Sequence, residues 1–553
     1  MRGWSPPGGA AAGSRPESTR CSESTSTVHV STCPSPYLPP QPLPPSWWVH
    51  SRRFRPDVAT HANSLVTWVG AVVRAHPLRP ALVHERTVWT YQQLWDRAGA
   101  VARRLLAMGL RRGHAVGLVG ANELDYIAAY FGIMRAGGAA VPVSHLLDAA
   151  AVKEQLAGVD ARAVFVGQVD ASVRDELART LTVLPMAGTA DAIGKGRLPF
   201  IGTRSSCAVM LTSGTTGRPK GVVHTQGTML HGALQLATVF PYGPSERSVV
   251  FLPLYACIPE QVLPMLCSGG CLEVLPGFDV ERVADACTRA TTFDAVPTIL
   301  SRLIEHAPLK KLSGLGWVTF ASEMMPVPLL QRWWDELPGV QTHQFYGMTE
   351  ILTLTAAPHQ LLRREPATVG RAFATTSLSV EHADGSTAGR GHGELIGAGP
   401  GRMRGYHEDV AATKAALAPD GSMRTGDLGW IDERGLVFLT GRSKDIIISG
   451  GINIAPAEIE AVAARHPAVE RVVVVGIPSE RWGETPIVVA VPRPGQPFTA
   501  AALLEHCRSR LAGYKRPSGA GLVEALPTTG IGKAAKDSVR QMITDGKIRL
   551  VRV

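Results

Sequence analysis

The sequence predicts an α/β protein with a large N-terminal domain, which holds layered α/β sheets and a β-rich subdomain, and a small α+β C-terminal domain. Three observations support this fold class. From about residue 60, helical and strand patterns alternate, which is typical of layers with largely parallel sheets. After about residue 375, short strands are joined by Gly and Asp turns. From about residue 445, a compact α+β pattern begins.

The periodicity of each segment supports these assignments in chain order. Helices are predicted where apolar residues recur at helical spacing, in "TYQQLWDRAGAVARRLLAMGL", "ELDYIAAYFGIMRAGG" and residues 226–239. Buried strands are predicted at "AVGLVG", "ARAVFVG", "CAVMLTS", "SVVFLPL" and "WVTFAS". The C-terminal pattern predicts the strands "DIIISGG", "VERVVVVGI" and "PIVVAVP" with the helices "APAEIEAVAARH" and "TAAALLEHCRSRL".

Three segments follow from this pattern: an extension over 1–45, a large domain over 46–441 and a small domain over 442–553. The extension is rich in Pro, Ser, Thr and Gly and has no pattern of core residues, so we expect it to be disordered. It also lacks the apolar core of a secretory signal peptide.

Composition narrows the classes of function. The chain has 553 residues, of which 45% are hydrophobic and 18% charged, as in globular proteins. No apolar run approaches the roughly 18 residues of a membrane span, so no integral membrane segment is predicted. The net charge of +10 is spread along the chain, which argues against nucleic acid and suits a small anionic substrate. The eight cysteines form no CxxC pair, and we predict reduced thiols in a cytoplasmic protein.

The most informative segment is "TSGTTGRPKG", Thr212–Gly221, which follows a predicted buried strand. Its three glycines allow the backbone to approach a ligand, and its hydroxyl groups and two cations suit anionic oxygens. We expect a strand-to-loop turn that leads into a helical segment and binds a polyphosphate. The loop lacks the G-K-[ST] end of a Walker A motif, and a mobile linker is the alternative that composition alone leaves open.

With its flanks, this segment resembles the phosphate-binding signature of the adenylate-forming enzymes, the superfamily of acyl- and aryl-CoA ligases, peptide-synthetase adenylation domains and beetle luciferases. Later motifs resemble the same superfamily in order and spacing: "QFYGMTE", "GELIGAGPGRMRGYHED", "RTGDLG", "GRSKDIIISGGINIAPAEIE" and "LPTTGIGKAAK". The resemblance covers roughly residues 60–540. It implies that 46–441 is an AMP-binding adenylation domain and that 442–553 is a mobile C-terminal domain with its hinge near Lys444.

The resemblance also implies ATP, Mg²⁺ and coenzyme A as cofactors, and assigns residues to the triphosphate. Lys533 matches the catalytic lysine, Thr349 a donor to the α-phosphate, and Glu350 the magnesium ligand. A lone carboxylate suffices because Mg²⁺ keeps most of its waters. The β- and γ-phosphates would be held by Thr212, Ser213, Gly214, Thr215, Thr216, Gly217 and Lys220.

Further positions match the nucleoside, the thiol and the acid. Asp427 and Arg442 would bind the ribose, because an ionised carboxylate offers two acceptor oxygens to its hydroxyls. Gly450 and Gly451 would make room for the pantetheine thiol. Adenine would lie against Ser322, Glu323, Met324, Tyr346 and Gly347, and the acid against Tyr255, Ala256 and Gly347. Many relatives carry His where Ala256 stands, which leaves the acid undefined.

The predicted function is therefore AMP-forming activation of a carboxylic acid, followed by transfer to coenzyme A. The apolar segment "YACIPEQVLPML" favours a fatty or aromatic acid. Two alternatives remain open: a stand-alone enzyme that loads an acyl carrier protein, and a catalytically silent nucleotide-binding protein. The predicted partners are a small carboxylic acid and a thiol carrier.

Overall fold

A computed structural model describes residues 64–188, 196–212, 219–450, 452–528 and 535–552. The chain divides into two compact units, Met1–Arg55 and Pro56–Val553, and all described residues belong to the second. The predicted disordered extension over 1–45 lies outside the described residues, so it stays a prediction. Within the described ranges, the strands form four sheets, named A to D below.

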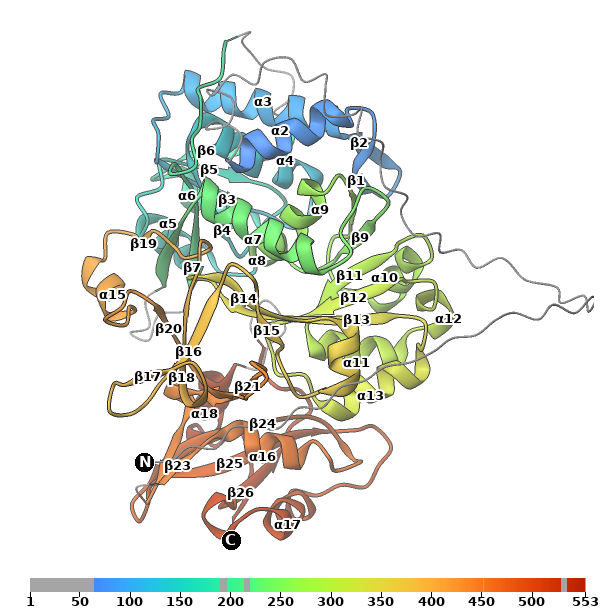
Figure 1. The fold of residues 1–553 in the computed structure, drawn as a ribbon, viewed down its shortest axis with the longest axis vertical. Helices are drawn as coiled ribbons and strands as arrows, with labels where there is room; N and C mark the ends of the chain where they lie inside the picture. Colours follow the sequence, from blue (N-terminus) through green and yellow to red (C-terminus); the bar gives the residue numbers. More distant parts are fainter. Residues whose placement is uncertain (1–63, 189–195, 213–218, 451, 529–534, 553) are drawn as a thin grey trace, which may run out of the picture. The chain divides into compact units, whose positions relative to one another are not determined.

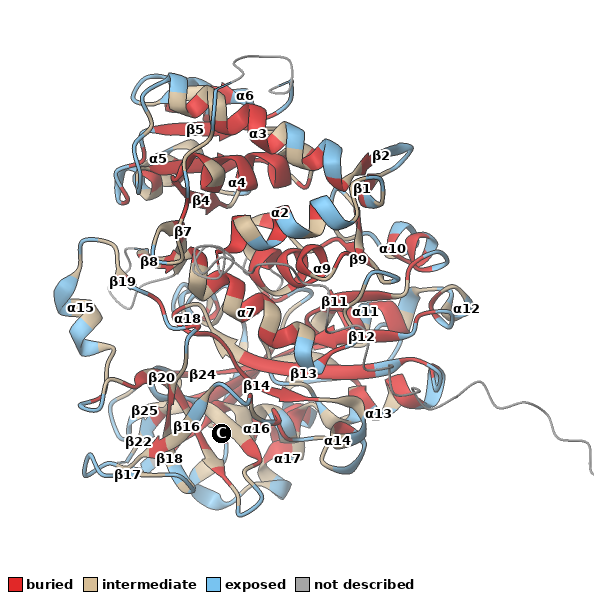
Figure 2. Ribbon diagram, turned by 45° about the horizontal axis from the view of Figure 1, so that its top comes forward, coloured by how far each residue is buried: buried red, intermediate tan, exposed pale blue. Residues whose placement is uncertain are grey.

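Sheet A has the strand order β15-β14-β13-β12-β11-β9-β10-β1-β2. Its strands from β13 to β1 are parallel, while β2, β14 and β15 pair antiparallel at the two edges. Buried residues run along β12 and β13 in Figure 2. The strands are β1 (Pro80–His84), β2 (Thr87–Thr90), β9 (Arg247–Val250), β10 (Cys271–Val274), β11 (Thr292–Ala295), β12 (Trp317–Phe320), β13 (Gln341–Met348), β14 (Leu352–Ala357) and β15 (Arg371–Ala372).

Sheet B has the order β19-β8-β7-β4-β3-β5-β6. Strands β3 to β7 pair in parallel, whereas β8 and β19 add an antiparallel edge. Both sheets confirm the layered α/β class predicted from the alternation of helices and strands. The strands are β3 (Ala115–Val119), β4 (Ala139–Val143), β5 (Ala163–Val166), β6 (Thr182–Pro185), β7 (Ser206–Thr212), β8 (Lys220–Thr225) and β19 (Gly405–Tyr406).

Helices between and beside these sheets bury their apolar faces in them. Helix α4 is buried along most of its length and packs against α3 (Figure 1). At this contact Gly132 lies against Val101, which leaves no room for a side chain at position 132. The helices of this region are α2 (Leu65–Ala75), α3 (Tyr91–Ala107), α4 (Leu124–Ala136), α5 (Ala149–Ala157), α6 (Ala171–Ala178), α7 (Gln226–Val239), α8 (Leu254–Cys257), the π-helix η3 (Ile258–Val262), α9 (Leu263–Cys267), α10 (Val280–Cys287), α11 (Pro297–His306), α12 (Leu309–Leu312), α13 (Val327–Glu336), α14 (His359–Arg364) and α15 (Val410–Ala415).

Sheet C is the β-rich subdomain that the Gly and Asp turns predict, with the antiparallel order β17-β16-β18-β20-β21. Its strands are β16 (Ser377–Glu381), β17 (Thr387–Ala388), β18 (Gly391–Ala398), β20 (Met423–Ile431) and β21 (Val437–Arg442). The 3₁₀ turn η4 (Ser443–Asp445) follows directly. It contains Lys444, so the predicted hinge position is an exposed turn between two strands, although hinge motion itself stays a prediction.

Sheet D and its helices form the predicted α+β C-terminal part. The main order is β23-β22-β25-β26-β27, and β24 pairs with β25. The elements are β22 (Ile447–Ser449), β23 (Ile452–Ile454), α16 (Pro456–Ala463), β24 (Val469–Ser479), β25 (Gly483–Pro492), α17 (Ala500–Arg510), η5 (Gly513–Lys515), β26 (Gly519–Leu522), α18 (Lys536–Thr544) and β27 (Leu550–Arg552).

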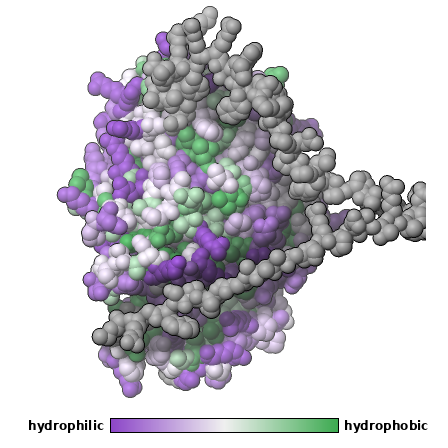
Figure 3. Space-filling view, viewed as in Figure 1, coloured by the Kyte–Doolittle hydropathy of each residue, from purple (hydrophilic) through white to green (hydrophobic). Residues whose placement is uncertain are grey.

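The surface of the described part is mixed in character. Hydrophilic and hydrophobic residues alternate in small patches on the face drawn in Figure 3. None of the helices in the described ranges is both long and apolar enough to cross a bilayer. The six described cysteines are free thiols, and most of them are buried, as the sequence predicts for reduced cysteines.

Candidate functional site

The predicted phosphate-binding loop connects two antiparallel strands of sheet B. Strand β7 ends at Thr212, β8 begins at Lys220, and these two residues are paired in register. The loop precedes the helix predicted over 226–239, since α7 begins at Gln226, but "KGVVHT" between them forms the strand β8, which the sequence analysis did not predict. The two valines of "KGVVHT" favour a strand, and this strand pairs with β7. Ser213, Gly214, Thr215, Thr216 and Gly217 lie outside the described residues, and their assignment stays a prediction.

Glu350 lies at the turn between β13 and β14 and is held by a tyrosine from a distant segment. Its side chain is buried, and the Tyr406 hydroxyl donates to Glu350 Oε1 at 2.7 Å. Burial and the negative charge of Glu350 raise the pKa of Tyr406, which keeps the phenol protonated as a donor. Sheet B places Tyr406 here, because β19 pairs with β8 and sets Tyr406 opposite Val222.

Lys220 joins this group from the start of β8. Its Nζ lies 5.0 Å from the centroid of the Tyr406 ring, a cation–π geometry. The structure thus brings together two residues that the sequence predicted, Lys220 and Glu350, through one that it missed. Tyr406 lies within "GRMRGYHED", a motif recognised in the sequence, but only the strand pairing reveals its contact with Glu350.

Thr349, the predicted donor to the α-phosphate, is held by a buried histidine. Nε2 of His224 lies 2.7 Å from the Thr349 carbonyl oxygen, and Nδ1 lies 3.1 Å from Thr228 Oγ1. Since a carbonyl only accepts, Nε2 carries the proton. Burial lowers the pKa of His224 to about 4, so the ring is neutral at pH 7. Sequence reasoning missed His224, although it lies in "KGVVHT", the segment that forms β8.

Asp427 and Arg442, the predicted ribose contacts, face each other across β20 and β21. The Arg442 Nε donates to Asp427 Oδ1 at 3.0 Å, and the Tyr346 hydroxyl donates to Asp427 Oδ2 at 2.8 Å. Burial and the charge of Asp427 raise the pKa of Tyr346. The carboxylate keeps free lone pairs, because each ionised oxygen accepts two hydrogen bonds. It therefore still has the capacity to accept ribose hydroxyls.

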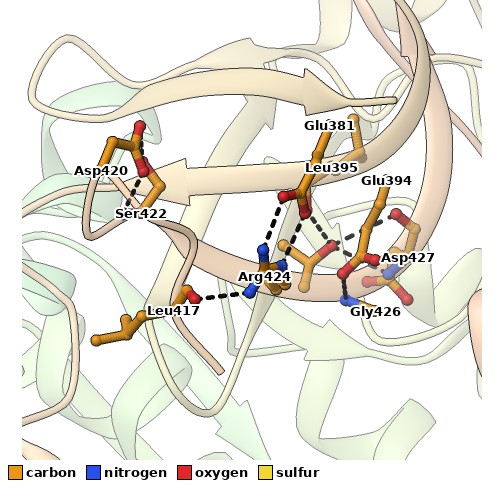
Figure 4. A network of polar contacts seen from close by, with 10 residues as sticks. Glu381, Glu394, Leu395, Leu417, Asp420, Ser422, Arg424, Gly426 and Asp427 are labelled. Carbon is orange, nitrogen blue, oxygen red and sulfur yellow. Dashed lines mark hydrogen bonds and ion pairs between the residues drawn. The ribbon is translucent and has the colours of Figure 1, made fainter. Parts of the chain in front are cut away.

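A polar network fixes the strand that carries Asp427 (Figure 4). The Arg424 guanidinium donates to both carboxylate oxygens of Glu381, each at 2.7 Å, and to the Leu417 carbonyl at 2.6 Å. The Gly426 N–H donates to Glu394 Oε1 at 3.0 Å. These contacts tie β20 to β16, to β18 and to the loop before it, so that Asp427 is held at a defined place.

The predicted adenine segment lies between β12 and α13. Ser322 has a positive φ of 74°, which is rare for a residue other than glycine. The carboxylate of Glu323 accepts from the Thr298 hydroxyl at 3.0 Å, near the start of α11, and Met324 is exposed. These contacts do not bear on adenine binding, so the adenine role of the three residues stays a prediction.

The predicted acid-binding residues lie on two elements. Tyr255 and Ala256 belong to α8, and the Tyr255 ring packs edge-on against His145 at 6.3 Å between centroids. Gly347 lies at a bulge of β13, where a Cβ atom would stand 1.7 Å from the Leu352 carbonyl oxygen. Only glycine fits this position, which keeps β13 and β14 paired up to the Glu350 turn.

The predicted C-terminal contributions are only partly described. Gly450 has a positive φ of 59°, and its N–H donates to the Trp482 carbonyl at 2.7 Å. Gly451 and Lys533 lie outside the described residues. Among the described residues there is no cluster of three or more His, Cys, Asp or Glu side chains suited to a metal ion. The donor set nevertheless fits Mg²⁺, which needs only one or two protein carboxylates.

Replacing Tyr406 by Phe tests the link to Glu350. We expect the affinity for Mg–ATP to fall about fivefold, because a hydrogen bond to a carboxylate contributes on the order of 1 kcal/mol and orients it. Isothermal titration calorimetry measures the change, and Tyr514→Phe at an exposed tyrosine is the matched control. Equal affinities of the Tyr406→Phe variant and the wild type would contradict the role of this hydroxyl.

The histidine that holds Thr349 makes a second prediction, on stability. His224 binds a proton near pH 4 in the folded state but near pH 6.5 when unfolded. The unfolded state therefore binds more protons between these values, and the free energy of unfolding falls as the pH decreases, by up to about 3 kcal/mol. Urea unfolding at pH 7 and pH 4.5 should show a smaller pH-dependent loss in His224→Gln. An equal loss in both proteins would count against a buried neutral ring.

Comparison with known proteins identifies the family. The family model described as "AMP-binding enzyme" matches residues 70–407, and that of the "AMP-binding enzyme C-terminal domain" matches 458–533. The chain is 31% identical to an indoleacetate–CoA ligase from Aromatoleum aromaticum over 87% of this chain and 98% of the relative. It is 33% identical to a feruloyl-CoA synthase from Amycolatopsis over 87% of this chain and 99% of the relative. ATP-bound MatB from Rhodopseudomonas palustris has a similar fold, with a TM-score of 0.81, 28% identity and coverage of 88% and 99%. The chain therefore belongs to the AMP-binding enzyme family of adenylate-forming acid–CoA ligases.

Proposed function

We propose that this protein activates a carboxylic acid with ATP to an acyl-adenylate and then transfers the acyl group to coenzyme A. The observation that carries the proposal is the set of contacts made by one segment, which runs from the end of β13 into the turn that follows. Its Tyr346 contacts the predicted ribose ligand Asp427, while Glu350 contacts Tyr406 beside Lys220. One segment thus spans the predicted ribose and phosphate contacts.

The chemistry requires two anions to meet, and the residues present suit that task. A carboxylate oxygen of the acid attacks the α-phosphorus, the bond to the bridging oxygen breaks, and pyrophosphate leaves. Lys220 and the predicted Lys533 would offset the negative charge, and Thr349 would donate to the α-phosphate. Glu350 would hold Mg²⁺, which neutralises phosphate charge when bound. In the second step the thiol sulfur attacks the acyl carbon, and AMP leaves with one former carboxylate oxygen.

A groove beside this site supports coenzyme A as the acceptor. The cavity has a volume of about 750 Å³ and is lined by residues that include Arg204, Arg402, Arg404 and His231. Arginine side chains suit the phosphates of coenzyme A. Thr228, which contacts the histidine that holds Thr349, also lines the groove. One residue of the groove is thus linked through His224 to Thr349, the predicted donor to the α-phosphate.

The relatives bear on the class of acid. The names indoleacetate–CoA ligase and feruloyl-CoA synthase both denote aromatic acids. A third relative, 30% identical, is named a long-chain-fatty-acid–CoA ligase, so together with the apolar segment around Tyr255 the relatives favour a fatty or aromatic acid for this chain. The free cysteines fit a reducing compartment, and we propose a cytoplasmic location on that ground.

The full chain with ATP, Mg²⁺ and a panel of fatty and aromatic acids tests this function. We expect acid-dependent pyrophosphate release and, once coenzyme A is added, an acyl-CoA ester detected by mass spectrometry. Lys533→Ala should abolish adenylation but leave transfer from supplied acyl-AMP, while Lys547→Ala, at an exposed ion pair, should retain both activities.

Each alternative function has its own outcome in this experiment. Pyrophosphate release without a coenzyme A ester, but with acylation of a carrier protein, would support the carrier-loading enzyme. No release with any acid would support a catalytically silent nucleotide-binding protein. Undiminished adenylation by Lys533→Ala would overturn the role assigned to that lysine.

A further inference from the structure

A row of polar side chains lies on one face of sheet A, opposite its apolar face. On β11, Phe293 and Ala295 pack into the cluster formed with α11 and α13. Since side chains alternate along a strand, Thr292 and Asp294 point to the other face. The register places Asp294 beside Thr319, and Thr319 beside His343, so a polar row crosses β11, β12 and β13.

Asp294 is buried in this row, and only one of its two carboxylate oxygens has a hydrogen-bond partner among the described residues. The residue is 6% exposed. The Thr319 hydroxyl donates to Asp294 Oδ1, while Oδ2 is buried without a hydrogen-bond partner among the described residues. A buried polar atom without a partner costs on the order of 1–3 kcal/mol. Such a group in a folded protein calls for a specific explanation, such as a ligand or a water.

The π-helix η3 places a second unsatisfied acceptor over the same face. The Gln261 Nε2 donates to Ser248 Oγ and to the Val249 carbonyl, both at 3.0 Å. These bonds tie η3 to β9, the strand next to β11. Gln261 Oε1 is buried and has no partner in the described part of the chain. π-Helical turns occur frequently at functional sites.

Aromatic rings pack against the polar row at β12 and β13. Trp317 lies on the polar-row face of β12, with ring centroids 5.0 Å from Tyr242 and 5.9 Å from His343. The Phe240 ring lies 5.2 Å from that of His343. Aromatic side chains beside polar acceptors are the surroundings that suit a flat apolar ligand with a polar group.

The polar row lies near the segment predicted to bind the acid. Gln261 lies in η3, which directly follows α8 with Tyr255 and Ala256. Burial above all, then the negative charges of Glu260 and Asp294, raise the pKa of Cys257, the residue directly after Ala256. Burial also raises the pKa of Asp294 itself to about 7. Asp294 is buried on the side of sheet A that η3 covers. Asp294 also lies near the carboxyl end of a parallel strand, where open α/β sheets bind ligands.

We infer that the acid activated by this enzyme carries a hydrogen-bond donor, a hydroxyl or amino group, at the end away from its carboxylate, and that Asp294 Oδ2 and Gln261 Oε1 accept from it. This inference rests on the proposed function and narrows its substrate to hydroxy- or amino-substituted aromatic acids. Asp294 is then the residue that determines specificity, and an unsubstituted acid would leave its carboxylate unsatisfied.

Matched pairs of acids test this inference on the full chain. Each pair differs by one group: phenylacetate with 4-hydroxyphenylacetate and with 4-aminophenylacetate, and 3-phenylpropanoate with 3-(4-hydroxyphenyl)propanoate. The readout is kcat/KM for acid-dependent pyrophosphate release. We expect the wild type to prefer the substituted acid by about tenfold or more, since sites built for a hydrogen bond discriminate against analogues that lack it.

Three variants separate recognition from structure. Asp294→Leu should abolish the preference or reverse it, and Asp294→Asn should keep part of it because the amide oxygen still accepts. Gln261→Met keeps a similar side-chain volume and should also reduce the preference. It replaces Asp294→Leu as the test if that variant does not fold. A purely structural role would lower kcat/KM for both acids of a pair alike and leave their ratio unchanged.

The outcomes distinguish this inference from the proposed function. Release with several acids, but a wild-type preference for the unsubstituted member of each pair, overturns the inference alone. An unchanged ratio in Asp294→Asn, Asp294→Leu and Gln261→Met does the same. Absence of release with every acid overturns the proposed function and the inference with it.

Discussion

The hydrogen bond from Tyr406 to Glu350 is the contact on which the candidate site depends. It joins β19, at the edge of sheet B, to the turn after β13 in sheet A. The hairpin of β7 and β8 brings Lys220 to the same tyrosine ring. The predicted magnesium ligand and one predicted phosphate ligand therefore lie on different sheets, and a single phenol contacts both.

Strand β13 also connects the site to the predicted ribose contact and, through it, to the predicted hinge. Tyr346 donates to Asp427, whose carboxylate also accepts from Arg442. Arg442 is the last residue of β21, directly before the turn that holds Lys444. If Asp427 binds the ribose as predicted, the nucleotide contacts the same carboxylate that accepts from Arg442, the residue directly before the predicted hinge.

Local patterns predicted the elements well, because helices and buried strands leave their period in the sequence. Helix α7 has the bounds predicted for it, and the sheets confirm the α/β class. Strand β8 was missed, because six residues between a glycine-rich loop and a helix carry little periodicity. The resemblance gave Glu350 and Asp427 roles that remain predictions, while the structure shows what holds each of them.

The residues that sequence reasoning missed make their contacts with segments that lie far away in the sequence. Tyr406 reaches Glu350 only because β19 pairs with β8, and His224 reaches Thr349 across 125 positions. Asp294 stands in a short apolar strand and shows no motif; only burial and an unsatisfied oxygen single it out. Burial and hydrogen bonding of single atoms depend on tertiary packing, which local periodicity does not encode.

An isotope experiment tests most directly whether this site joins an acid to the α-phosphate of ATP. The enzyme is supplied with an accepted acid labelled with ¹⁸O in its carboxylate, together with ATP, Mg²⁺ and coenzyme A, and the nucleotide product is analysed by mass spectrometry. An acyl-adenylate pathway predicts AMP that carries one ¹⁸O atom in its phosphate. Unlabelled AMP, or ADP with the label in inorganic phosphate, would contradict it.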